Sequence, residues 1–413
     1  MITEYARRLA AAAIVCCVLD GSAGAEELSL GRAVELALKN NPTIAAGDLS
    51  ADAAGHRAQG ARALANPEII VAPSFVGDAG ADSALLWSQP LEINGSRRVR
   101  GQIAAYEASA AKQDALVVTR DVVLDVKLLY WDVVEAQELV ELNRKNIDYV
   151  RTIDAAVRKQ LDVGATPGSS VIKSEVELAN ARQQLSRAQL ELRQARSALG
   201  TTLGCPIGSD FTAADPLTFT EMPLGRDKLM AACVSRRPEV ASGEALVAAA
   251  NRRIKAARLE ALPDIAIQAR KESFADGDGG FAVALTLPIL DWGSVRAEKR
   301  QARSEALARQ KELEALRNQA ALDVEQGIHA VETASGIVQE YHGGILDKSE
   351  SLAAMAQKGY EKGAIGYLGV LEAQRTLLGA RTGYISALAD HARAAARLEW
   401  ATCSPLGVSE VQE

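Results

Sequence analysis

The chain has 413 residues and a formal net charge of −7, and 48% of its residues are hydrophobic although only 4% are aromatic. This balance is typical of long helices packed on each other and argues against an aromatic-rich globular core. The mild acidity and the lack of any basic run argue against a nucleic-acid partner.

Residues 1–25 are typical of a secretory signal peptide. Two arginines precede the apolar stretch Leu9 to Leu19, and the segment ends in the small residues Ser22 to Ala25. The apolar stretch is too short to span a bilayer, which takes about 20 residues in a helix. We therefore expect cleavage after residue 25. A lipid anchor on Cys16 or Cys17 is less favoured, because the large Val15 stands before Cys16, where a lipid-attachment signal requires a small residue.

Prolines and glycines of the first half recur in the second half 196 to 199 residues later, at four places: Pro42 and Pro238, Pro67 and Pro263, Gly95 and Gly293, Gly164 and Gly363. Chance would not keep four such positions in register. The sequence therefore predicts two tandem repeats, at 26–204 and 226–401, with a joining segment at 205–225 and a tail at 402–413.

Each repeat is expected to contain the same elements in the same order. A short amphipathic helix and an alanine-rich helix lead into a β-hairpin, and a very long helix then ends at a glycine-rich tip from which a return helix follows. The spacing predicts the short helices at 30–39 and 227–235, the alanine-rich helices at 43–64 and 239–261, and the long helices at 96–161 and 294–360, with a weak point at Gly343-Gly344.

The hydrophobic period changes from 3.6 to 2 in each hairpin. Phe281, Val283, Leu285, Leu287 and Ile289 are apolar, and the residues between the first four of them are small. This alternation is typical of a strand with one apolar face. A lone two-stranded ribbon is marginally stable in water, so the apolar face needs a partner.

Two similar stretches, SQPLEINGSRR at 88–98 and TLPILDWGSVR at 286–296, mark the corner between each hairpin and its long helix. Gly95 and Gly293 have the conformational freedom that the turn requires, and we expect Ser96 and Ser294 to cap the helices.

The strand count predicts an assembly of several chains. Four strands cannot close a membrane barrel, since the smallest use eight, and an open sheet with an apolar face and unpaired edges would aggregate. Several chains must then share one barrel, and three copies would provide twelve strands. The long helices would extend from this barrel as a bundle.

The ordered set of these features resembles the outer-membrane efflux factors, the TolC-type channels of Gram-negative bacteria. The resemblance covers the opening LSLGRAVELALKNNPTI, the duplication, the hairpins, the corner and the second tip YEKGAIGYLGVLEAQRTLLGAR. The stretch LWSQPLEINGSRRVR is most similar to the CzcC-like branch, which serves heavy-metal resistance-nodulation-division (RND) pumps. The resemblance implies a mainly α protein whose homotrimer forms a 12-stranded outer-membrane β-barrel and a periplasmic α-helical tunnel.

The resemblance also implies the partners. A periplasmic adaptor (membrane fusion) protein would dock on the tips and connect the tunnel to an inner-membrane RND-type pump, which would supply the energy. The chain has no phosphate-cradling loop and no catalytic signature, so we expect neither an enzyme nor a cofactor. The cargo, which could be a heavy-metal cation or an organic compound, stays open.

Family positions map onto residues of both tips. The tip glycines fall on Gly164 and Gly363, and the adjoining Ala165 and Ala364 fall in the adaptor-docking turn. We therefore expect these four residues to form the docking surface.

Other family positions concern the periplasmic entrance. Glu372 matches one carboxylate of an acidic pair that narrows the entrance, whereas the second carboxylate position holds Gly369. Tyr360 matches a tyrosine of the gate network, but the arginine position holds Ile365 and the aspartate position of the first tip holds Ser170. We expect Glu372 and Tyr360 at the entrance, with a surface salt bridge as the alternative role for Glu372.

The histidines and cysteines carry little chemistry. The four histidines are scattered without the spacing of metal ligands, so we expect no metal site. Cys205, Cys233 and Cys403 remain after export, and their pairing is open. A periplasmic coiled-coil scaffold that transports nothing is the alternative function, but it leaves the apolar hairpin faces without a purpose.

Overall fold

The structure is a computed structural model that describes residues 26–73, 83–164, 166–205, 211–221, 225–226, 229–230, 236–271, 279–286 and 292–404. The expected signal peptide, Ala165 of the first tip, Cys233 and most of the second short helix lie outside the described residues.

Two compact units make up the described chain, and each contains segments of both repeats. The first unit takes in the described residues of Met1–Thr43, Arg120–Leu229 and Asp323–Glu413, and the second takes in those of Ile44–Thr119 and Met230–Leu322. The long helices α4 (Ser96–Asp162) and α8 (Ser294–Glu340) contribute to both units. The compact bodies of the molecule therefore do not coincide with the tandem repeats.

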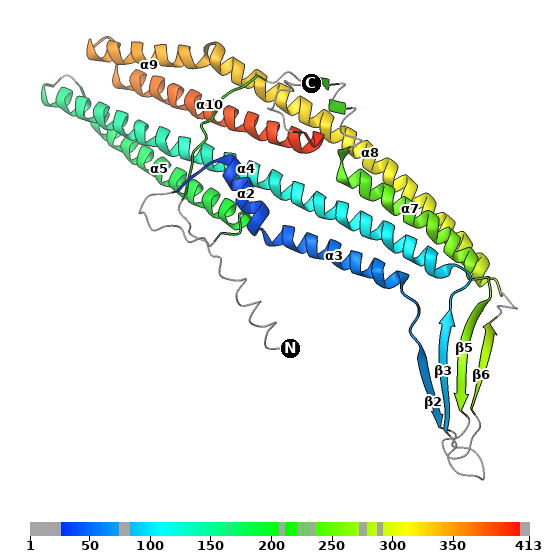
Figure 1. Cartoon of the computed structure of the whole chain (residues 1–413). Coiled ribbons are helices and arrows are strands. Elements are labelled where there is room, and N and C mark those ends of the chain that lie inside the picture. The colour runs from blue at the N-terminus through cyan, green and yellow to red at the C-terminus, as the bar shows by residue number, and fades with distance from the viewer. Residues whose placement is uncertain are drawn as a thin grey trace. The chain divides into compact units, whose positions relative to one another are not determined.

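The described part of the second unit contains four helices that pack through small residues. Helix α3 (Pro42–Arg62) pairs with α4, and α7 (Pro238–Leu259) pairs with α8 (Figure 1). Ala54 and Ala58 of α3 form a buried cluster with Ala108 of α4. Alanine side chains let the helix backbones approach closely, which accounts for the alanine-rich composition of these segments.

A four-stranded antiparallel sheet lies in the described part of the second unit. Its order is β2 (Glu68–Pro73), β3 (Ser83–Leu91), β5 (Asp264–Lys271) and β6 (Gly279–Thr286). The two expected hairpins are confirmed, and pairing of β3 with β5 joins them. Strands β2 and β6 lie at open edges, and the apolar side chains of β6 are exposed, Phe281 at 88% and Val283 at 71%.

The strand-to-helix corners depend on glycine. Gly95 has φ 84° and Gly293 has φ 100°, both in the left-handed region that glycine adopts without strain. The capping residue differs from the expectation, because the backbone N–H of Ser96 donates to Asn94 Oδ1 at 2.9 Å. Asn94, two residues earlier, has a side chain that can reach this first orphan donor, and Ser96 already belongs to the helix.

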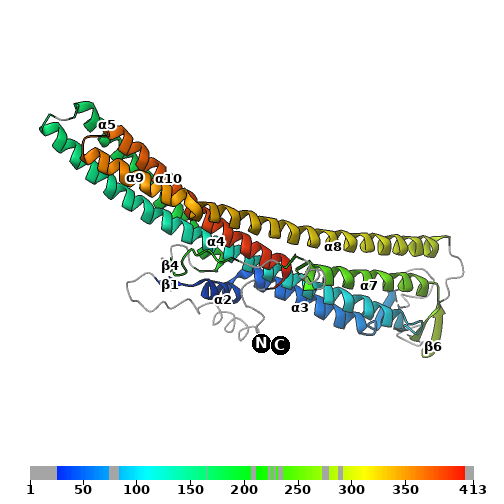
Figure 2. The same cartoon turned by 90° about the horizontal axis from the view of Figure 1, so that it is seen from above.

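The first unit consists mainly of coiled helix pairs. Helix α2 (Leu30–Asn40) begins at the Ser29 cap, and α5 (Gly168–Thr202), α9 (Leu346–Glu361) and α10 (Tyr367–Thr402) lie along α4 (Figure 2). Arg393 of α10 reaches Asp132 and Glu135 of α4 at 2.7 and 2.8 Å. This half-buried charge network fixes α10 on α4.

The expected weak point of the second long helix is a π-helical turn, η1 (Tyr341–Ile345). Gly344 has φ 151°, outside the helical region, so the helix is interrupted where two glycines adjoin. The first repeat has arginine and lysine at the matching place and its helix is continuous. The interruption therefore follows from the local sequence.

A small parallel sheet lies beside α4 in the first unit. Strand β1 (Glu26–Leu28) pairs with β4 (Phe211–Ala213), which lies within the segment that joins the repeats. The buried hydroxyl of Tyr130 lies 2.9 Å from Leu28 O and 2.6 Å from Asp215 Oδ2. Burial and the neighbouring Asp215 carboxylate raise the pKa of Tyr130, so the hydroxyl stays protonated and holds the sheet on α4.

Candidate functional site: the two helical tips

The second tip is a glycine turn between α9 and α10. Gly363 has φ 72°, and its N–H donates to Tyr360 O at 3.0 Å, while the N–H of Ala364 donates to Gly359 O at 2.8 Å. These bonds satisfy carbonyl groups that a helix end leaves open. Gly363 and Ala364 are exposed, and a Cβ at Gly363 would meet nothing within 4 Å.

The first tip has the same kind of turn. Gly164 has φ 70°, its N–H donates to Leu161 O at 2.9 Å, and a Cβ there would also meet nothing within 4 Å. Of the four expected docking residues, the structure thus places Gly164, Gly363 and Ala364 on open surface at the ends of helix pairs. The docking role itself stays a prediction.

Ile365 is held over two glycines at the second tip. A Cβ at Gly359 would lie 2.7 Å from Ile365 Cδ1, and a Cβ at Gly369 would lie 2.7 Å from Ile365 Cγ2. Both positions must therefore lack a side chain for Ile365 to take this place. The aliphatic side chain of Ile365 thus packs within the turn.

Tyr360 is a packing residue of the tip region. It is 6% exposed in a cluster with Ile153 and Val157 of α4 and Tyr367 and Val370 of α10. Its hydroxyl has no hydrogen-bond partner among the described residues, and burial raises its pKa. The ring therefore helps to join the tips through apolar contact, and its expected role at an entrance stays a prediction.

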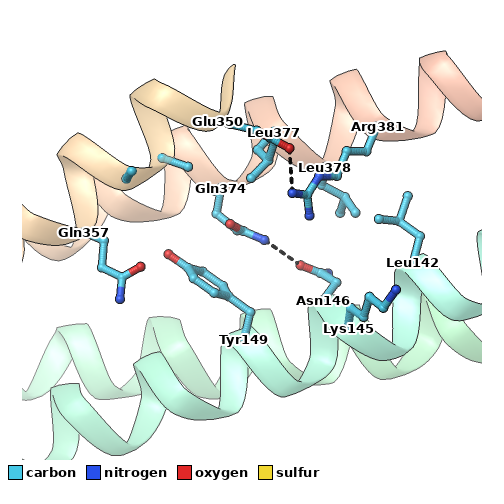
Figure 3. Close-up of a pocket in the computed structure, with 12 residues that line it drawn as sticks. Leu142, Lys145, Asn146, Tyr149, Glu350, Gln357, Gln374, Leu377, Leu378 and Arg381 are labelled. Carbon is cyan, nitrogen blue, oxygen red and sulfur yellow. Dashed lines mark hydrogen bonds and ion pairs between the residues drawn. The ribbon is translucent and has the colours of Figure 1, made fainter. Parts of the chain in front are cut away.

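Two polar links also join the helix pairs of the two tips. Arg375 of α10 binds the carboxylate of Glu177 of α5 through both Nε, at 3.2 Å, and Nη2. Nearby, Gln374 Nε2 donates to Oδ1 of the buried Asn146 of α4 at 3.3 Å (Figure 3). The sequence did not reveal these four residues, since the partners lie about half the chain apart.

A pocket lies between α4, α9 and α10 beside these links. Its volume is about 380 Å³, and Asn146, Tyr149 and Gln374 are among the side chains that line it. Figure 3 shows the Arg381–Glu350 pair at the rim of this pocket, with a shortest distance of 2.8 Å. The lining is mixed, and no pair of groups in it has the arrangement of a catalytic acid and base.

Glu372 lies on the exposed face of α10, one turn before Arg375 and Thr376. Its side chain forms no ion pair with any of the residues that the structure describes. The alternative of a surface salt bridge within the chain thus has no partner in the described ranges. The expected ring of carboxylates requires further copies and stays a prediction.

Neither a metal-ligand cluster nor a membrane-spanning helix occurs in the described residues. Within them, no three His, Cys, Asp or Glu side chains come together as ligands of one metal ion. None of the helices described combines the length and the apolar character that crossing a membrane requires.

Cys403, which ends α10 with φ 53°, has its Sγ 2.9 Å from Arg120 Nη1.

Long paired helices, exposed tips and a four-stranded sheet with two free edges are elements of a fold that solved outer-membrane channels share. Solved structures share this fold: a CusC structure has a TM-score of 0.77 at 19% identity and covers 93% of this chain and 95% of that chain. VceC from Vibrio cholerae has a TM-score of 0.77 at 16% identity, with 91% and 96% covered.

Sequence comparisons identify the family. The model of the outer membrane efflux protein family matches residues 33–205 and 229–403. The pyoverdine export protein OpmQ of Pseudomonas aeruginosa is 26% identical over 71% of this chain and 64% of its own length. The cobalt-zinc-cadmium resistance protein CzcC of Cupriavidus metallidurans is 26% identical over 90% of this chain and 89% of its own length. The chain belongs to the outer membrane efflux protein family, and the predicted family and fold class are confirmed.

Proposed function

We propose that three copies of this chain form the outer-membrane duct of a tripartite efflux system that exports metal cations. The observation that carries the proposal is the four-stranded sheet, whose edges β2 and β6 are open and whose apolar side chains are exposed. Each copy contributes four strands, and twelve strands close into a barrel with no free edge. The duct is passive, and an inner-membrane RND-type pump provides the energy.

The cargo class is supported by the extent of one similarity. CzcC, a cobalt-zinc-cadmium resistance protein, aligns with 90% of this chain, whereas the toluene efflux protein TtgF aligns with 76% of it at 25% identity. An exposed carboxylate at Glu372, repeated three times around one axis, suits a passage for cations.

The tips provide the surface for a periplasmic adaptor protein. Gly164 and Gly363 lie at open turns, so a helical hairpin of the adaptor could approach the backbone closely. Because both glycines have positive φ, a side chain there strains the turn as well as adding bulk. Bulk and strain must therefore be separated in any test.

Two variants separate these effects. Ala364→Trp adds bulk at an exposed position, whereas Gly363→Ala strains the turn and adds one methyl group. We expect Ala364→Trp to abolish export while the trimer remains folded and inserted, and Gly363→Ala to export nearly normally after a modest loss of stability. Normal resistance in an Ala364→Trp strain that makes wild-type amounts of trimer would contradict docking at the tips.

The cargo is tested in a deletion strain. Growth should become sensitive to cobalt, zinc or cadmium and not to toluene, and the intact gene should restore resistance. Sensitivity to toluene alone would overturn the metal assignment and keep the channel. Release of the protein from membranes by salt without detergent would overturn the channel itself.

A further inference from the structure

The two repeats build equivalent helix pairs in the second unit. Gly47 of α3 faces Ala115 of α4, and Gly243 of α7 faces Leu313 of α8. The α7 partner follows its counterpart by 196 residues (243 − 47), and the α8 partner follows by 198 (313 − 115). A shift of 196 residues therefore relates α3 to α7, and a shift of 198 residues relates α4 to α8.

The hairpins obey the same two shifts. Glu68 of β2 stands opposite Ser88 of β3, and Asp264 of β5 stands opposite Thr286 of β6. The differences are again 196 (264 − 68) and 198 (286 − 88). The leading halves of the repeats, each a helix, a hairpin and a long helix, are thus equivalent in register as well as in order.

The repeats meet at one junction inside the chain. There β3 pairs with β5, with Ser88 opposite Gln268, and Glu107 of α4 forms an ion pair with Arg253 of α7. The two charged side chains are 39% and 45% exposed, respectively, so the pair lies at the surface of the junction. Strand β3 and helix α4 of the first repeat thus contact strand β5 and helix α7 of the second repeat, through backbone pairing of the strands and an ion pair between the helices.

The shifts carry this junction to the two free edges of the chain. Adding 198 to Glu107 gives Glu305 on α8, and subtracting 196 from Arg253 gives Arg57 on α3. The glutamate and the arginine of the internal junction thus have counterparts of the same residue type at the two outer edges. Arg57 is exposed and forms no ion pair within the described ranges, and the carboxylate of Glu305 accepts one hydrogen bond, from Gln301 at 2.9 Å.

We propose that the two free edges bind each other between copies of this chain, with Glu305 of one copy paired to Arg57 of the next. The same shifts place β6 beside β2 of the next copy, with Thr286 opposite Ala72. The contact is head-to-tail, which generates a closed ring when the rotation between copies closes. The inference rests on the proposed trimer and adds the residues and the register of its interface.

Charge reversal tests the ion pair in the full-length trimer in detergent. Arg57→Glu and Glu305→Arg each place like charges at all three junctions. An exposed pair changes an equilibrium constant by up to about fivefold, so three junctions together raise the dissociation constant of the ring by roughly 100-fold. The double variant R57E/E305R restores opposite charges and should return to within a few-fold of the wild type. Failure of the double variant to recover trimer overturns the proposal.

Arg253→Glu is the matched control. It reverses one charge of the internal junction, and the Arg57–Glu305 contact keeps its charges. We expect it to lower the thermal stability of each copy without a change in the dissociation constant of the trimer. An effect on the monomer–trimer equilibrium as large as that of Arg57→Glu would count against the separation of the two junctions, and so against the proposal.

Cross-linking distinguishes this inference from the trimer on which it rests. Cysteines at positions 57 and 305, in a background with Cys205, Cys233 and Cys403 replaced by serine, should be joined between copies by a short bismaleimide. Covalent dimers and trimers on a denaturing gel support the interface. A trimer by native mass spectrometry that gives no cross-linked product overturns the interface and leaves the proposed function standing. A wild-type protein that remains monomeric overturns both.

Discussion

Replacement of Arg375 by glutamine tests whether the link between the two tips controls the passage. The guanidinium of Arg375 makes two hydrogen bonds to the Glu177 carboxylate, which joins α10 to α5. The Arg375 side chain is 59% exposed and that of Glu177 is 16% exposed. The change removes the charge and the bidentate geometry and leaves a largely buried carboxylate without its partner.

The expected cost is set by this partial burial. Exposed ion pairs contribute about 0.2–1 kcal/mol, and an unsatisfied buried acceptor adds about 1 kcal/mol. We therefore expect about 1–2 kcal/mol per copy, which multiplies the population of any arrangement without the link by roughly 5–30-fold. Three copies in one channel increase the effect further.

Single-channel conductance in planar bilayers measures that population. Arg375→Gln should raise the fraction of time at high conductance, and Glu177→Gln should act alike. Arg381→Gln is the control, since Arg381 pairs with Glu350 at a shortest distance of 2.8 Å but joins α10 to α9 of the same tip, and these two side chains are 43% and 51% exposed. Equal conductance in the Arg375→Gln, Arg381→Gln and wild-type channels would refute the reasoning.

Three further outcomes are expected. Glu372→Gln should lower the cation preference of the channel about fivefold, since a carboxylate at about 4 Å in water attracts a cation by about 1 kcal/mol. Unchanged selectivity would identify Glu372 as a plain surface charge. Burial lowers the pKa of His391 from 6.5, so the unfolded chain binds more protons below that pH. The free energy of unfolding should then fall as the pH drops from 7 to 5, and His391→Gln should flatten that slope. Gly204→Ala should cost at least about 1–3 kcal/mol in thermal melts, because φ is 70° and the new Cβ would lie 2.6 Å from Asn40 O.

Glycines at turns and the alternating pattern of the strands made most of the fold predictable. The corners and the tips lie at the glycines from which the sequence analysis predicted them. All four have positive φ: Gly95, Gly293, Gly164 and Gly363. The hairpins were predictable because the period of 2 is strong in β6. These signals are local, and each can be read within about ten residues.

Strand β4 could not be predicted from a short stretch of sequence. Its three residues, Phe211–Ala213, are too few to display a period, and its partner β1 starts at Glu26. The pairing depends on Tyr130, which lies on α4 and binds Asp215 and Leu28. The joining segment at 205–225 was therefore expected as a plain connection, and its strand exists through contacts that no short window contains.

The tip links escaped prediction for a related reason. Glu177 and Arg375 belong to different helix pairs, and many charged residues on those helices could have met across the gap. Only the rotation of each helix about its axis decides which side chains face each other. Similarly, the sequence placed Tyr360 at the tip but did not indicate that its ring would be buried against α4.

The duplication explains how so few strands per chain can serve a large ring. A ring of three copies would contain six junctions between repeats, and three of them, one inside each chain, are of the type that joins β3 to β5. An internal junction forms at the high effective concentration that a covalent connection provides. Only three junctions then depend on collision between copies, and each would present the same strand register and the same charge pair as the internal one. A chain with one repeat would have to form all six by association, with twice as many free edges exposed before closure.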